Sequence, residues 1–162
     1  MSNFVKVTHD VLDVGAINSL VSEASTGATS IFVGTTRDHF GGKKVLRLDY
    51  EAYEPMAVKK MLELCQELRT KWPLHNIAIY HRLGQVCPTE ASVVIAVTSE
   101  HRRASLEALA HAIDTLKTTV PIWKKEVYED GDEWKANPEC KWSGKNPTSK
   151  NAESLTNGQN KQ

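Results

Sequence analysis

Two lysines on either side of a proline have the spacing of a cationic binding site. Lys117 lies near the end of a helical pattern, and Lys124 follows Pro121 by three residues. Apolar neighbours and a nearby second cation lower the pKa of a lysine, so that it acts as a proton carrier or nucleophile at neutral pH. In this interpretation Lys117 is catalytic and Lys124 binds an anionic group. The alternative is that Lys117 extends its ammonium group from the helix edge into solvent.

Three more basic residues are candidates for binding the same anion. Arg37 lies in a loop after an apolar segment, and His101 and Arg102 lie at a helix start, where free backbone amides favour an anion. For His101 and Arg102 a solvated surface is an equal alternative, and for Arg37 taken alone a solvated loop position is the favoured interpretation. Arg102 precedes Lys117 by fifteen residues, a separation of about 22 Å along a continuous helix. If both serve one substrate, we expect His101 and Arg102 to come from a second copy across a twofold interface.

Two helices are predicted to position these groups. The longer pattern predicts one amphipathic helix that Pro121 ends, because proline removes a backbone donor. Its apolar stripe comprises Leu106, Leu109, Ala110, Ile113, Leu116 and Val120, and Lys117 falls on or beside this stripe. The other main helix begins at Pro55 and ends near Trp72. Its predicted core face comprises Val58, Met61, Leu62, Cys65 and Leu68.

Alternating and apolar segments predict strands between these helices. They are Phe4–Thr8, Ala28–Thr35, Val45–Tyr53, Ile77–Leu83, Ser92–Ser99, Ile122–Tyr128 and Glu133–Lys135, with a short helix between Asp13 and Glu23. Polar segments at Thr36–Lys44 and Gly84–Glu90 are expected to be a loop and a turn. The mixture predicts an α+β fold with a mixed or antiparallel sheet and two main helices. Residues 1–146 are expected to form one domain, and residues 147–162 a disordered tail.

Composition excludes several classes of function. Twenty basic residues balance twenty acidic ones, which argues against bulk nucleic-acid or membrane-surface binding. The three cysteines form no CxxC pair and the histidines show no metal-ligand spacing, so neither a metal nor another cofactor is predicted. The odd cysteine count and the absence of a signal-peptide pattern favour the cytosol.

Five ordered motifs resemble the large, catalytic subunits of molybdopterin synthases, and the segment Asn137–Trp142 resembles their eukaryotic form. The motifs are Phe32–Asp38, Leu48–Tyr53, His81–Gly84, Val97–Arg102 and Leu116–Glu126. The last, LKTTVPIWKKE, is the most specific. The likeness extends from about Ala28 to Trp142 and therefore covers most of the predicted domain.

The resemblance implies a function, a fold and a set of site residues. The family converts cyclic pyranopterin monophosphate into molybdopterin by installing two sulfur atoms as a dithiolene, a step of molybdenum cofactor biosynthesis. Sulfur arrives as a thiocarboxylate on the C-terminus of a small ubiquitin-like partner, and two large subunits form the centre of a heterotetramer. The family fold is of the α/β-hammerhead type. By motif, the essential lysines correspond to Lys117 and Lys124, and the substrate contacts to Arg37, His101, Arg102, Lys125 and Glu126.

Two rival functions follow from the same residues. A non-catalytic module would use the basic pocket to bind a phosphorylated ligand or the C-terminal tail of a partner without changing the ligand. A phosphate-ester hydrolase is a weaker alternative, because the sequence shows neither a metal cluster nor an activated nucleophile.

Overall fold

A computed structural model describes residues 1–135 of the chain. Its helices are α1 (Val14–Val21), α2 (Glu54–Lys71) and α3 (Arg102–Thr119). Its strands are β1 (Asn3–Thr8), β2 (Ala28–Thr35), β3 (His39–Phe40), β4 (Lys43–Ala52), β5 (Ile77–Arg82), β6 (Gly84–Val86), β7 (Ala91–Ser99), β8 (Ile122–Tyr128) and β9 (Gly131–Lys135). The expected tail at residues 147–162 and the last part of the expected domain lie outside the described residues.

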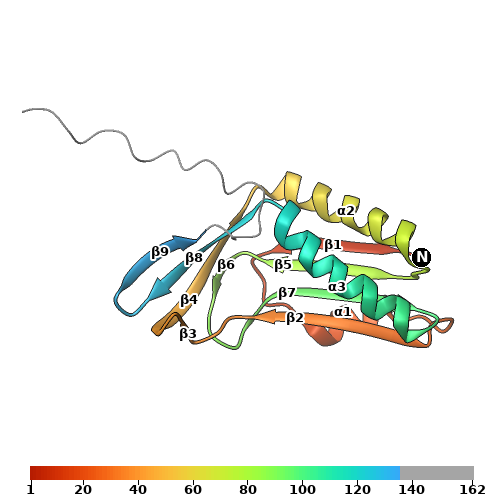
Figure 1. The fold of residues 1–162 in the computed structure, drawn as a ribbon, viewed down its shortest axis with the longest axis horizontal. Coiled ribbons are helices and arrows are strands. Elements are labelled where there is room, and N and C mark those ends of the chain that lie inside the picture. The colour runs from red at the N-terminus through yellow and green to blue at the C-terminus, as the bar shows by residue number, and fades with distance from the viewer. Residues whose placement is uncertain (136–162) are drawn as a thin grey trace, which may run out of the picture.

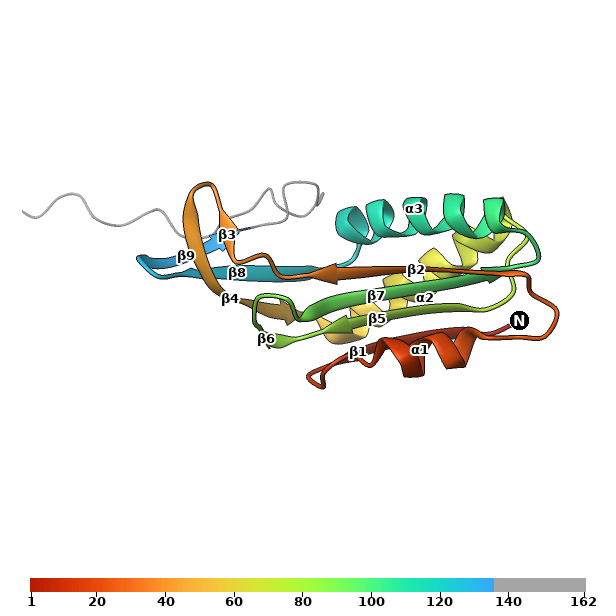
Figure 2. The same cartoon turned by 90° about the horizontal axis from the view of Figure 1, so that it is seen from below.

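The first sheet is the centre of a layered body. Its strand order is β1-β5-β7-β2, with β1 parallel to β5 and the other neighbours antiparallel. Helices α2 and α3 cover one face and α1 covers the other (Figures 1 and 2). Apolar side chains are buried on both faces, since β7 is buried from Ser92 to Ser99. The predicted α+β class, mixed sheet and two main helices are confirmed.

A second sheet extends from the end of the first, beyond the C-terminus of α3 (Figure 1). Its order is β3-β4-β8-β9, and β6 also pairs with β4. The predicted loop at Thr36–Lys44 therefore contains a short strand, β3, which pairs back onto Lys43 and Lys44 through a turn at Gly41 and Gly42. The predicted turn at Gly84–Glu90 likewise contains β6. Both short strands pair with β4 in the second sheet.

Helix α3 ends where the proline predicts, but its buried face differs from the expected stripe. The last helical residue is Thr119, and the amide of Val120 closes the helix on the carbonyl of Leu116. Leu106, expected in the core, is 55% exposed. The buried helix positions are Ser105, Ala108, Ala112 and Leu116, of which only Leu116 belongs to the expected stripe. Small side chains at three of these four positions let the helix backbone approach the sheet closely, which turns Leu106 outward.

Two more leucines are exposed: Leu62, from the predicted core face of the helix that begins at Pro55, and Leu46, which the alternation of the predicted strand Val45–Tyr53 places on one face with Leu48 and Tyr50. Leu46 is 43% exposed because a register shift between Val45 and Arg47 interrupts the alternation of β4. The bulge buries Val45 and Leu48 and leaves Leu46 on the outer face. On α2, Leu62 is 40% exposed, since Met61, Leu64, Cys65 and Leu68 already fill the face toward the sheet. In residues 1–135, no helix is both long and apolar enough to cross a membrane.

Candidate active site

A cavity of about 420 Å³ opens at the junction of the two sheets and the C-terminal end of α3. Six separate parts of the chain line it, which is why no single stretch of sequence defines it. The lining residues are Phe32–Thr35 of β2, Arg37 after it, Tyr50 of β4, His81 of β5, Ser92 and Val93 of β7, Ile113, Leu116, Lys117 and Val120 around the end of α3, and Ile122 and Lys124 of β8.

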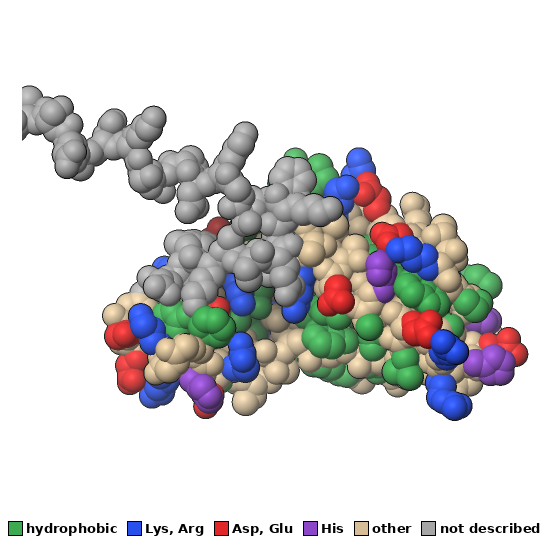
Figure 3. Space-filling model, in the orientation of Figure 1, with side chains coloured by type: hydrophobic (Ala, Val, Ile, Leu, Met, Phe, Trp, Pro, Cys, Tyr) green, Lys and Arg blue, Asp and Glu red, His purple; other side chains and the backbone are tan. Residues whose placement is uncertain are grey.

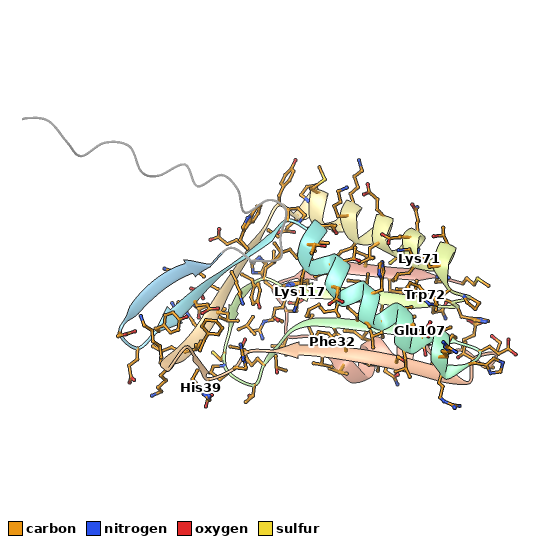
Figure 4. All side chains as sticks on the ribbon, viewed as in Figure 1. Phe32, His39, Lys71, Trp72, Glu107 and Lys117 are labelled. Carbon is orange, nitrogen blue, oxygen red and sulfur yellow. The ribbon has the colours of Figure 1, made fainter. Side chains whose placement is uncertain are left out.

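The mouth of this cavity carries three cations. Arg37, Lys117 and Lys124 all line it, so the structure brings together three residues that the sequence places in two distant motifs. Figure 3 shows Lys and Arg side chains gathered between the second sheet and the helical body, and Figure 4 shows Lys117 on α3 beside β2, which carries Phe32. The guanidinium of Arg37 stacks on Phe40 at 5.6 Å from the ring centroid. Three convergent cations favour an anionic ligand.

Of the two orientations that the sequence leaves open for Lys117, the structure shows the exposed one. Its side chain is exposed, whereas Leu116 beside it is buried. Successive helix positions point about 100° apart, so the residue after Leu116 turns away from the sheet and toward the open side of the cavity. Lys117 therefore lies at the mouth of the cavity and is not buried in the protein core.

Lys124 is held by a buried carboxylate. Lys124 and Glu126 share one face of β8, with Lys124 Nζ 3.4 Å from Glu126 Oε1. The Glu126 side chain is 5% exposed and accepts a hydrogen bond from the hydroxyl of Tyr128. The Lys124 side chain is 33% exposed and reaches the cavity. Glu126 thus fixes the ammonium group from behind while the other side of Lys124 faces the ligand space.

The floor of the cavity is polar but uncharged. The hydroxyl of Tyr50 donates to Ser92 Oγ at 3.3 Å, and Ser92 Oγ donates to the carbonyl of Gly34 at 3.3 Å. Burial, with the carboxylate of Glu126 nearby, raises the pKa of Tyr50, which keeps its proton. His81 packs against the edge of Tyr50 with ring centroids 5.1 Å apart. Burial lowers the pKa of His81 to about 4, so its ring is neutral at physiological pH.

The buried His81 makes stability depend on pH. The unfolded chain takes up a proton on this ring below about pH 6.5, whereas the folded chain does so only near pH 4. The contribution of His81 is therefore complete above pH 6.5 and is lost as the pH falls toward 4. Between pH 7 and pH 5 we expect the wild-type chain to lose about 2 kcal/mol more unfolding free energy than His81→Phe. Urea titrations at both pH values measure this difference; equal losses would contradict it.

Four residues that the family motifs place in the site do not line the cavity: Glu126, which lies behind Lys124, and His101, Arg102 and Lys125. His101 is the N-cap of α3 and Arg102 its first residue, so both lie at the far end of the helix from Lys117, as the spacing predicted. They border two other surface pockets there and are exposed. Lys125 alternates with Lys124 along β8 and therefore faces the opposite side of the strand.

The sequence interpretation missed Tyr50, His81 and Ser92. A signal for His81 was present, because it continues the two-residue period of Ile77 and Ile79 and so belongs to the buried face of β5. A histidine at a core position needs a polar partner or a cavity. Tyr50 and Ser92 gave no such signal, since each becomes a site residue only when β4 and β7 meet.

Comparisons with known proteins place this architecture in a family. The family model described as "MoaE protein" matches residues 7–119. Molybdopterin synthase catalytic subunit 1 of Aedes aegypti is 59% identical over 145 residues, which cover 87% of this chain and 94% of that relative. The chain belongs to the MoaE family.

Solved structures of MoaE proteins share the fold described above. The crystal structure of molybdopterin synthase from Staphylococcus aureus matches with a TM-score of 0.77 and 36% identity, over 80% of this chain and 94% of that one. A complex of subunits 1 and 2 of the molybdopterin-converting factor from Helicobacter pylori matches with a TM-score of 0.71. At 20% identity, over 86% of this chain and 97% of that one, this second likeness shows the fold alone. The resemblance inferred from the five motifs is confirmed, and with it an enzyme of molybdenum cofactor biosynthesis rather than a non-catalytic module.

Proposed function

We propose that this MoaE chain converts cyclic pyranopterin monophosphate into molybdopterin by adding two sulfur atoms as a dithiolene. The observation that carries the proposal is the convergence of Arg37, Lys117 and Lys124 on one cavity. A cyclic phosphate needs cationic clamps, and these three groups are of the types that supply them. The cavity volume of about 420 Å³ lies in the range of small-molecule sites.

Lys117 and Lys124 take different roles in this proposal. Lys124 is fixed by Glu126 at 3.4 Å and is thereby suited to holding an anionic group in one position. Lys117 lies on the exposed side of the mouth, where it meets both the pterin and an incoming sulfur donor. Its amine is suited to transferring protons during sulfur addition or to holding the carbonyl of the donor covalently. Lys117 is therefore the principal catalytic residue.

The sulfur comes from outside the chain. Neither Cys65 nor Cys87 lines the cavity. Cys65 is buried in α2, and burial raises the pKa of its thiol to about 12, so it stays an unreactive thiol. We propose a small ubiquitin-like partner with a C-terminal thiocarboxylate as the donor. The two-subunit complex solved for the Helicobacter pylori relative supports such a partner.

A second copy of the chain completes the site. His101 and Arg102 lie at the opposite end of α3 from Lys117, about 22 Å away along the helix. Side chains of one chain do not close that distance. A twofold pair of chains, flanked by two small subunits, would bring these groups to the phosphate of the neighbouring site. We place the reaction in the cytosol, which the free thiols of Cys65 and Cys87 support.

One reconstitution tests the proposed function. The chain is mixed with a thiocarboxylated small subunit and cyclic pyranopterin monophosphate, and the dithiolene product is followed by mass spectrometry. We expect molybdopterin to form at the expense of the thiocarboxylate. Binding of the partner tail with an unchanged pterin would instead identify a non-catalytic module. Release of inorganic phosphate without sulfur transfer would identify a hydrolase.

Replacing the carboxylate behind Lys124 is expected to weaken catalysis. Glu126→Gln keeps a hydrogen-bond acceptor for Tyr128 but removes the charge that holds Lys124. Because small displacements of a catalytic group are costly, we expect kcat/KM for the pterin to fall about tenfold. Glu129→Gln is the matched control, since Glu129 pairs with Lys44 on the surface at 3.5 Å. Equal kcat/KM values for the two variants would show that Glu126 does not position Lys124.

A further inference from the structure

The cavity floor has a chemical character different from that of its mouth. The mouth carries the cations Arg37, Lys117 and Lys124, all of which are exposed or half-buried. At the floor, His81 and Ser92 are each only 5% exposed. A ligand with a charged end and an uncharged end is therefore bound in one direction, with its charge outward.

His81 is held in a single orientation at this floor. Its Nδ1 lies 2.8 Å from the carbonyl oxygen of Arg82, and a carbonyl only accepts, so Nδ1 carries the proton. The edge contact with Tyr50, at an interplanar angle of 68°, fixes the plane of the ring. Nε2 has no hydrogen-bond partner within residues 1–135. In a neutral imidazole this second nitrogen is an acceptor.

The other floor groups also offer acceptors rather than donors. Tyr50 uses its proton on Ser92, and Ser92 uses its own on the carbonyl of Gly34. The hydroxyl oxygens keep lone pairs, as does His81 Nε2. A floor of acceptors is complementary to a heterocycle that carries N–H groups, and it is a poor match for a phosphate or a carboxylate.

We propose that His81 selects the heterocycle of the substrate, with Nε2 accepting a hydrogen bond from an N–H group of the pterin. The pterin then enters the cavity first, and the phosphate stays at the mouth with Arg37 and Lys124. This assignment rests on the proposed function for the identity of the substrate. His81 is a specificity-determining residue here, distinct from the cationic groups that act on the phosphate and the sulfur donor.

Binding measurements with two partial ligands test this division. Calorimetry compares a phosphate-free pterin, such as biopterin, with inorganic phosphate. His81→Phe keeps a ring against Tyr50 but has no acceptor, so we expect about tenfold weaker binding of the phosphate-free pterin and unchanged binding of phosphate. His81→Gln places an amide oxygen near the position of Nε2 and should bind the pterin within about threefold of wild type. Lys124→Ala should bind inorganic phosphate more weakly than wild type and should bind the phosphate-free pterin as wild type does.

Two controls keep the result interpretable. His9→Gln changes an exposed histidine outside the cavity and should bind both ligands as wild type does. Nitrogen-15 NMR of the wild-type chain reads the same contact without any substitution, because the Nε2 resonance of His81 should move with the pterin and not with phosphate. Wild-type pterin affinity in His81→Phe, equal losses in the Phe and Gln variants, or an unmoved Nε2 resonance would each overturn the proposal. These experiments measure binding and not turnover. A wild-type chain without synthase activity would therefore overturn the proposed function and leave the binding role of His81 to be decided by these experiments.

Discussion

Lys117→Ala is expected to lower the rate of dithiolene formation about 10³-fold while leaving the fold intact. Lys117 is exposed on α3, so its truncation removes no core packing. In the proposed function, the variant loses the amine of Lys117, which lies on the exposed side of the mouth and meets both the pterin and the incoming thiocarboxylate. The measurement is a single-turnover assay with saturating thiocarboxylated partner, together with a melting curve and the affinity for the partner, both of which should match wild type.

Lys117→Arg separates charge from proton transfer at the same position. Arginine keeps the positive charge but stays protonated throughout the physiological range. We expect this variant to bind the pterin nearly as well as wild type and to remain defective in turnover. Lys59→Ala, at an exposed position of α2 away from the cavity, is the matched control and should turn over normally. Normal turnover in Lys117→Arg would reduce the role of Lys117 to charge alone, and normal turnover in Lys117→Ala would remove it from the mechanism.

Mixed dimers of Lys117→Ala and Arg102→Ala are expected to recover about half of the wild-type activity, although each parent is nearly inactive. In a site built from Lys117 of one copy and Arg102 of the other, a mixed dimer contains one intact site and one doubly defective site. Two affinity tags, one on each variant, isolate the mixed dimer after co-expression. The product rate per dimer is then compared with that of wild type and of both parents.

A site contained within one chain gives the opposite result. Every chain in the mixed dimer then carries a defect, and the activity stays at the level of the parents. The geometry makes this outcome hard to reconcile with α3, because Arg102 and Lys117 occupy its two ends. A dimer that carries both substitutions on one chain and none on the other is the control. It loses one residue from each of its two sites in the composite arrangement, whereas one chain stays fully active in the alternative.

Local chemistry in the sequence was sufficient to predict the ends of the elements and the cationic mouth. Pro121 ends α3 within two residues, since no proline amide can continue the helical hydrogen bonds. The positions of Lys117 and Lys124 on either side of Pro121 predicted that they lie on adjoining elements. In the structure both line the cavity. The five motifs were specific enough to indicate the family that the comparisons confirmed.

Only the tertiary structure decided which faces of these elements open into the cavity. Periodicity relates a residue to its own helix or strand, but burial depends on which neighbour covers that face and where the neighbour ends. Leu106 is thus exposed because small residues turn α3 onto the sheet, and Lys117 turns outward with it. His81 continues the core face of β5 in sequence, yet in the structure it lines the cavity. The reason is that α3 ends beside this cavity.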